Sequence, residues 1–129
     1  MMMRANSSLI LLFLSFLAFP SCNPCADTLK SKVASPDHQL VAASYERNCG
    51  ATTDFSSIVN VQSTASKFDG DDGVLFVAKG RYDISVEWVG PRALTIHCTG
   101  CSRKNIFREV TALGDIDVRY EFAENPERK

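Results

Sequence analysis

Short segments in which apolar and polar residues alternate constrain the fold of this chain more than any other feature. In the clearest segment, Ile84, Val86 and Trp88 alternate with Ser85 and Glu87. A period of two puts the apolar side chains on one face of an extended strand, whereas an amphipathic helix needs a period of about 3.6 residues. We therefore expect a strand here, with Trp88 packed in the core rather than exposed in a binding site.

Several other segments have the same extended character, and turn signatures separate them. At Ser35-Pro36-Asp37-His38, proline presets φ, and the Asp37 side chain can accept a bond from the backbone two residues on. Six or seven short strands without a long helix predict an all-β fold, an antiparallel meander forming a small sandwich or open barrel. The predicted strands cover residues 39–45, 56–62, 74–78, 84–88, 94–97, 106–111 and 116–122. We expect one β domain over residues 35–123, a tether over 22–34 and a charged tail over 124–129.

The first 21 residues have the composition of an export signal. Arg4 gives the start of the chain a positive charge, and residues 9–19 are apolar except for Ser15. This apolar run is shorter than the span of about 20 residues that crosses a membrane. We therefore predict a cleaved signal peptide over residues 1–21.

The end of this signal resembles the lipobox of bacterial lipoproteins, in which a cysteine is lipid-modified. The segment Leu17-Ala18-Phe19-Pro20-Ser21 leads directly to Cys22. Ser21 fits the lipobox pattern, and Phe19 and Pro20 depart from it. We expect lipidation at Cys22 and a product anchored in the cell envelope, facing the periplasm or the cell exterior. A soluble secreted product and an uncleaved anchor are the alternatives.

The five cysteines of the chain are an odd number for an exported protein. If lipid consumes Cys22, four cysteines remain, and four cysteines allow three pairings. We favour Cys25 with Cys49, which closes a loop of moderate length, and Cys98 with Cys101, which staples a tight turn.

The CxxC motif at Cys98 and Cys101 has two sharper interpretations. A thiol-redox site places such a motif at the start of a helix, but here a strand precedes it and residues 102–105 lack a helical apolar pattern. A structural zinc site needs four ligands, and His97 with the two cysteines supplies three. A structural disulfide is the favoured interpretation.

The sequence contains no convincing catalytic or metal-binding constellation. The G-x-S-x-G elbow of serine hydrolases is missing, and Cys49 could pair with His38 or His97 only if it were not in a disulfide. The acidic segment 69–73 departs from the EF-hand register, so a solvated turn is favoured over a calcium site. We therefore predict a protein that is not an enzyme and has no cofactor.

The charge of the chain argues against a nucleic-acid partner. The formal charge is −1 for the full chain and becomes −2 when Arg4 is removed with the signal. Arg103, Lys104 and Arg108 form the one local positive cluster in the sequence, which we interpret as a solvated loop.

Several blocks of the chain together resemble a group of small bacterial lipoproteins. These blocks are the SPDG-like turn at 35–38, the C-G-A-T-T block at 49–53, Gly73-Val74-Leu75-Phe76, the strand of Trp88 and the closing Val118-Arg119-Tyr120. The resemblance runs from Cys25 to Phe122. It implies an envelope location and a single β domain, and it supplies no activity.

The sequence therefore favours a non-enzymatic envelope lipoprotein that acts as a binding or structural module. Its lipid would hold it at the membrane, and another envelope protein is a candidate partner. One alternative is a periplasmic inhibitor or immunity-type protein that binds a hydrolase through a loop such as 63–72. Another is a thiol-redox accessory protein that uses Cys98 and Cys101.

Overall fold

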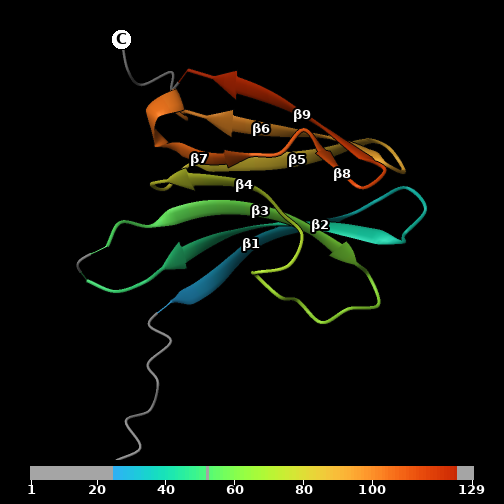
Figure 1. Ribbon diagram of the computed structural model, residues 1–129, viewed down its shortest axis with the longest axis horizontal. Helices are drawn as coiled ribbons and strands as arrows, with labels where there is room; N and C mark the ends of the chain where they lie inside the picture. The colour runs from blue at the N-terminus through green and yellow to red at the C-terminus, as the bar shows by residue number, and fades with distance from the viewer. Residues whose placement is uncertain (1–24, 52, 125–129) are drawn as a thin grey trace, which may run out of the picture.

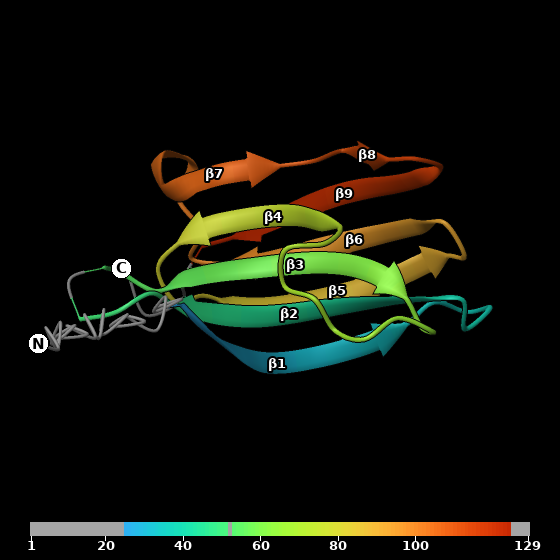
Figure 2. The same cartoon turned by 60° about the horizontal axis from the view of Figure 1, so that its bottom comes forward.

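The chain folds as a sandwich of two β-sheets, shown in a computed structural model that describes residues 25–51 and 53–124 (Figures 1 and 2). Sheet A has the strand order β1-β2-β3-β4-β7, and sheet B has the order β5-β6-β9-β8. The strands are β1 (Ala26–Ala34), β2 (Leu40–Asn48), β3 (Ser56–Ser63), β4 (Val74–Lys79), β5 (Asp83–Gly90), β6 (Ala93–Thr99), β7 (Ile106–Glu109), β8 (Ala112–Leu113) and β9 (Ile116–Ala123), with one 3₁₀ turn, η1 (Arg103–Asn105). The predicted all-β class is confirmed, and the architecture is the sandwich rather than the open barrel.

All seven predicted strands are present, but their connections are not a simple meander. Strands β1 to β4 do follow one another across sheet A. The chain then changes sheet three times: β5 and β6 belong to sheet B, β7 joins the free edge of β4, and β8 and β9 return to sheet B. As a result β9 lies parallel to β6, with Ile96 opposite Tyr120, which corrects the expectation of purely antiparallel pairing.

The segment predicted as a tether contains strand β1. Ala26 to Ala34 pair antiparallel with β2, so the β domain begins earlier than residue 35. Local sequence hides this strand because most of its side chains are exposed and no apolar alternation results. Its backbone hydrogen bonds to β2 hold it at the edge of sheet A. Two features protect this edge from pairing with another chain. The strand is irregular between Leu29 and Ser31, and it carries two lysines, Lys30 and Lys32.

The main hydrophobic core lies between the two sheets. Trp88 and Ile84 are partly buried against it, and Val86 belongs to it, as the alternating pattern predicts. The buried members of this core are Ala42, Val59, Val61, Leu75, Phe76, Ala78, Val86, Leu94, Ile96, Cys98, Ile116 and Val118.

A second apolar cluster lies on the other face of sheet A, where Ala43, Tyr45 and Ile58 are buried. The connection from β3 to β4 covers this cluster, and in Figure 2 it crosses in front of β3. The Tyr45 hydroxyl donates a hydrogen bond of 2.5 Å to the carbonyl oxygen of Gly70 in this connection. Gly73 has a φ of +64°, and a Cβ there would collide with the carbonyl oxygen of Val61. The connection can therefore lie this close to the sheet only with glycine at position 73.

Arg92 lies in the β5–β6 turn and links it to two other turns at the end of the sandwich farther from Cys25. Its guanidinium contacts Asp37 of the β1–β2 turn at 3.1 Å, Gln39 at 2.8 Å and Asp115 of the β8–β9 turn at 3.4 Å. The predicted bond from the backbone N–H of Gln39 to the Asp37 carboxylate is present at 3.1 Å. Hydrogen bonds from Ser35, Gln39 and Arg92 lower the pKa of Asp37.

Candidate functional site

Both predicted cysteine pairings are within bonding distance. Cys25 pairs with Cys49, and Cys98 pairs with Cys101. Cys98 points into the core with 1% of its surface exposed, while Cys101 is partly buried. Predicted lipidation at Cys22 falls outside the described residues, as do the signal over residues 1–21 and residues 125–129 of the tail.

The strand registers place one end of the domain around the Cys25–Cys49 disulfide. A row of paired residues crosses sheet A there: Asp27 lies opposite Arg47, Arg47 opposite Ser56, and Ser56 opposite Lys79. In sheet B, Asp83 is opposite Thr99 at the same end. We call this end of the sandwich the Cys25 end.

A pocket of about 570 Å³ opens at the Cys25 end, and we call it the rim pocket. Three connections build it: the β2–β3 loop, the β4–β5 turn and η1. The basic side chains of Lys79, Arg81 and Lys104 line it together with one carboxylate. Its full lining is Asp54, Phe55, Lys79, Gly80, Arg81, Tyr82, Lys104 and Asn105.

Several groups of the rim pocket make short contacts with one another. The guanidinium of Arg81 lies over the ring of Phe55, 4.2 Å from its centre, in a cation–π arrangement. Lys79 Nζ is 3.0 Å from Asp54 Oδ2. The Tyr82 hydroxyl accepts a hydrogen bond of 3.0 Å from the Asn105 side chain, so its own proton is left for another acceptor.

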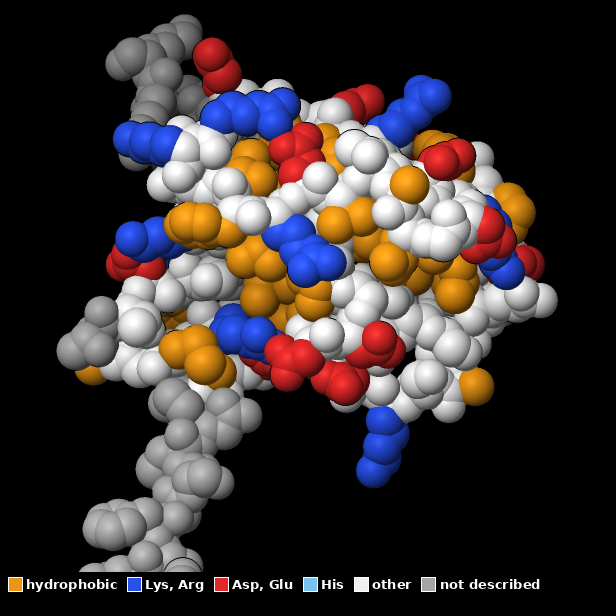
Figure 3. All heavy atoms as spheres, viewed as in Figure 1, with side chains coloured by type: hydrophobic (Ala, Val, Ile, Leu, Met, Phe, Trp, Pro, Cys, Tyr) orange, Lys and Arg blue, Asp and Glu red, His pale blue; other side chains and the backbone are white. Residues whose placement is uncertain are grey.

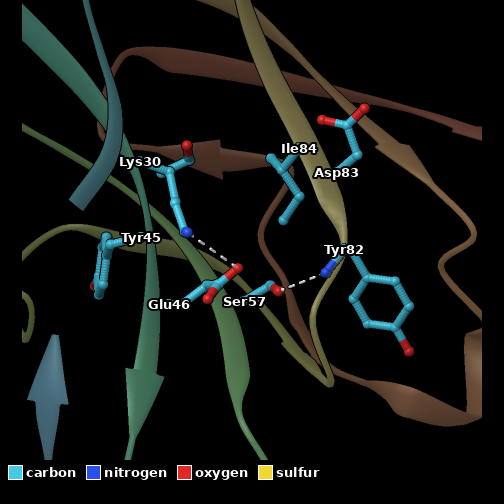
Figure 4. A pocket seen from close by; sticks show the side chains of 8 residues that line it. Lys30, Tyr45, Glu46, Ser57, Tyr82, Asp83 and Ile84 are labelled. Carbon is cyan, nitrogen blue, oxygen red and sulfur yellow. Dashed lines mark hydrogen bonds and ion pairs between the residues drawn. The ribbon is translucent and has the colours of Figure 1, made fainter. Parts of the chain in front are cut away.

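A second, smaller cavity of about 230 Å³ lies on the other side of Tyr82, between sheet A and β5 (Figure 4). Glu46, with a side chain 13% exposed, points toward Lys30 at 3.7 Å and also contacts Arg81 at 3.1 Å. The Ser57 hydroxyl donates to the Gly80 carbonyl at 2.8 Å and accepts from the Tyr82 N–H at 3.1 Å. Both hydrogen-bonding roles of this hydroxyl are thus used to hold the β4–β5 turn.

The positive cluster predicted as a solvated loop is divided by the structure. Arg103 pairs with Glu109 at 2.6 Å and lies over the ring of Phe122, 5.1 Å from its centre. Lys104 lines the rim pocket instead, and Arg108 is exposed on β7. Lys and Arg side chains gather at the left end of Figure 3, where η1 and the end of β4 lie in Figure 1.

The structure does not bring Cys49 close to His38 or His97, the residues that could have formed a catalytic Cys–His pair. Cys49 is in a disulfide at the Cys25 end, and His38 lies in the turn at the far end, with a φ of +58°. His97 is on the outer face of sheet B, where its ring nitrogens lie 3.3 Å from Glu87 and 3.0 Å from Glu121.

The acidic segment 69–73 is a turn packed on sheet A. The Asn60 side-chain amide donates hydrogen bonds of 3.0 Å to the carbonyl oxygens of Asp69 and Asp72. The carboxylate of Asp71 contacts Arg47 at 3.0 Å. Across residues 25–51 and 53–124, no group of three or more His, Cys, Asp or Glu side chains is placed to hold a metal ion.

No family model, no curated protein and no solved structure matches this chain. The resemblance to small bacterial lipoproteins therefore stays a prediction. Within the described residues no helix has the length and apolar character needed to cross a membrane.

The rim pocket is not predicted by the sequence. Its closest signal is the run Lys79-Gly80-Arg81-Tyr82, in which two cations and an aromatic ring occupy a short connection between two predicted strands. The remaining lining residues, Asp54, Phe55, Lys104 and Asn105, come from segments on either side of this run in the sequence, and only the folded sheets bring them to it.

Proposed function

We propose that this protein is a lipid-anchored protein of the bacterial cell envelope whose β-sandwich acts as a non-enzymatic binding module. The observation that carries the proposal is the pairing of the cysteines. Two disulfides use four of the five cysteines, so Cys22 is the one left over by this count. A lipobox-like segment directly before Cys22 gives that cysteine a role.

The position of the disulfides supports the same proposal. Disulfides persist in oxidising compartments such as the bacterial periplasm and the cell surface. The Cys25–Cys49 bridge fastens the first residues of the domain to sheet A, close to the site where the anchor would be attached.

Intact-mass measurement of the protein purified from a bacterial envelope fraction tests this proposal. The expected mass corresponds to a chain starting at a diacylglyceryl-modified Cys22 with two disulfides. A Cys22→Ala variant should lose the lipid mass, while Ser21→Ala, which keeps a small residue before the cysteine, should retain it. A mature N-terminus elsewhere with no lipid on the wild-type chain would overturn the anchor.

One observation supports the alternative function as an inhibitor or immunity-type protein. The connection from β3 to β4, residues 64–73, is held in one conformation by hydrogen bonds to sheet A. Backbone atoms of Asp69, Gly70 and Asp72 are held by side chains of sheet A, so this connection is preorganised for binding. Phe68 is 39% exposed on it, and an aromatic side chain is a common anchor at protein interfaces. Recovery of one hydrolase in a 1:1 complex from envelope extracts, lost in a Phe68→Ala variant, would favour this alternative.

The thiol-redox alternative has less support. Cys98 is 1% exposed within β6, whereas the attacking sulfur of a redox motif must be accessible as a thiolate. Reduction of insulin disulfides by the purified protein at a rate above background would be needed to revive this alternative.

A further inference from the structure

The Cys25 end is the end that an anchor on Cys22 would hold against a membrane. Cys22 precedes Cys25 by three residues, and three residues span at most about 11 Å even when fully extended. The disulfide to Cys49 ties Cys25 to the β2–β3 connection. Because the same connection carries Asp54 and Phe55, the rim pocket lies at this end too.

The charge of the rim pocket suits an anionic ligand. Lys79, Arg81 and Lys104 line the pocket with one carboxylate, Asp54. Arg81 also contacts Glu46 through Nε at 3.1 Å, and Glu46 is shared with Lys30. A formal excess of one positive charge remains when both carboxylates are counted against the three cations of the pocket. The Lys79–Asp54 pair joins side chains that are 52% and 66% exposed, and exposed ion pairs of this kind are weak. Lys79 can therefore exchange this contact for a phosphate oxygen at little cost.

Besides the two lysines, Arg81 and Tyr82 supply hydrogen-bond donors to the pocket. Arg81 is held over Phe55, and its planar guanidinium has several N–H groups suited to phosphate oxygens. The Tyr82 hydroxyl, which accepts from Asn105, has its own proton to donate. Charge-assisted bonds from such donors to phosphate are stronger than bonds between neutral groups.

One exposed apolar residue close in sequence to the pocket residues favours a lipid surface over a soluble phosphate. Phe107 on β7 is 69% exposed, two residues after the last residue of η1, which carries Lys104. Aromatic side chains are favoured at the level of lipid headgroups, where one end of the ring contacts apolar chains.

We infer that the rim pocket binds the phosphate of an anionic phospholipid headgroup in the membrane that holds the Cys22 lipid, with Lys79, Arg81 and Lys104 as the contacting cations. This inference rests on the proposed lipid anchor. It gives the domain a fixed orientation, with the Cys25 end on the membrane and the opposite end, where Arg92 lies, directed away from it.

Vesicle partitioning of the purified mature protein, processed and lipidated as the cell makes it, tests the inference. The protein is distributed between phosphatidylcholine vesicles and vesicles that also contain phosphatidylglycerol. We expect the wild type to prefer the anionic vesicles and the double variant Lys79→Gln/Lys104→Gln to lose about tenfold of that preference. The matched control, Lys32→Gln/Lys67→Gln, removes the same charge from exposed positions outside the pocket and should keep most of it.

The outcomes separate this inference from the proposed anchor. Equal preferences in the wild type and both double variants, on protein whose mass shows the lipid, would overturn the headgroup site and leave the anchor intact. Loss of preference only in the pocket variant supports the site even if the mass shows no lipid. Displacement of the protein from anionic vesicles by glycerol phosphate at the concentration of the lipid phosphate would overturn a membrane lipid as the ligand.

Discussion

The indole N–H of Trp88 donates a hydrogen bond of 2.9 Å to the backbone carbonyl oxygen of Val33, 55 residues earlier in the chain. Val33 is in β1 of sheet A, and Trp88 is in β5 of sheet B. This bond joins the two sheets at one edge of the sandwich. At the other side of the core, the Tyr120 hydroxyl of β9 lies 2.6 Å from the Val110 carbonyl oxygen, in the crossover between the sheets.

A Trp88→Phe substitution should destabilise the domain by about 2 kcal/mol, because it removes this hydrogen bond and part of the buried ring. Urea unfolding followed by circular dichroism measures the loss. Val89→Ala is the matched control, because Val89 is the next residue on β5 and is 61% exposed. Its cost should stay within about 0.5 kcal/mol. Equal losses in the two variants would mean that the contact between β5 and β1 contributes nothing.

A Gly73→Ala substitution should destabilise the domain by more than Gly114→Ala. Both glycines have a positive φ, +64° and +59°, so each alanine incurs a backbone cost of about 1 kcal/mol. A Cβ at position 114 has open space, while a Cβ at position 73 would collide with the Val61 backbone. We expect at least about 2 kcal/mol of additional loss for Gly73→Ala in denaturant unfolding. Similar losses would show that the 64–73 connection does not need its close approach to β3.

Removal of the Cys25–Cys49 bridge should cost about 3 kcal/mol, because the bridge closes a loop with a sequence separation of 24 and so restricts the unfolded chain. The double variant Cys25→Ala/Cys49→Ala, compared with the wild type in urea unfolding, measures this cost. Hydrogen exchange of β1 amides reports whether the strand stays paired with β2. A loss below about 1 kcal/mol would contradict the chain-entropy account of this bridge.

Stability should fall as the pH rises above the ordinary tyrosine pKa of 10. Burial raises the pKa of both Tyr45 and Tyr120, so the folded state keeps these protons at a pH where the unfolded state loses them. Their stabilising contribution is complete below pH 10 and is lost as the pH rises toward the folded-state pKa. Alkaline unfolding of the wild type should therefore be steeper with pH than that of Tyr45→Phe/Tyr120→Phe. Identical pH slopes would contradict burial of the two hydroxyls.

Much of the fold follows from local sequence because the periodicity of a strand is local. The alternation at residues 84–88 and 116–122 reports which side chains face the core without reference to any other strand. The Cys98–Cys101 pairing and the bond from Gln39 to Asp37 also lie within a few residues. The structure confirms these features, and they were predictable because each depends only on residues that are close in the sequence.

The sequence by itself determined the β class, seven of the strands and the disulfide partners, since each rests on short-range patterns or on cysteine arithmetic. Only the tertiary structure decided that β1 is a strand, that β9 lies parallel to β6, and that Lys79, Arg81 and Lys104 share a pocket. The physical reason is that strand partners and sheet membership depend on how distant segments bury their apolar faces against each other. β1 has few apolar residues of its own and is held by the backbone of β2 and by Trp88, partners that no local pattern can reveal.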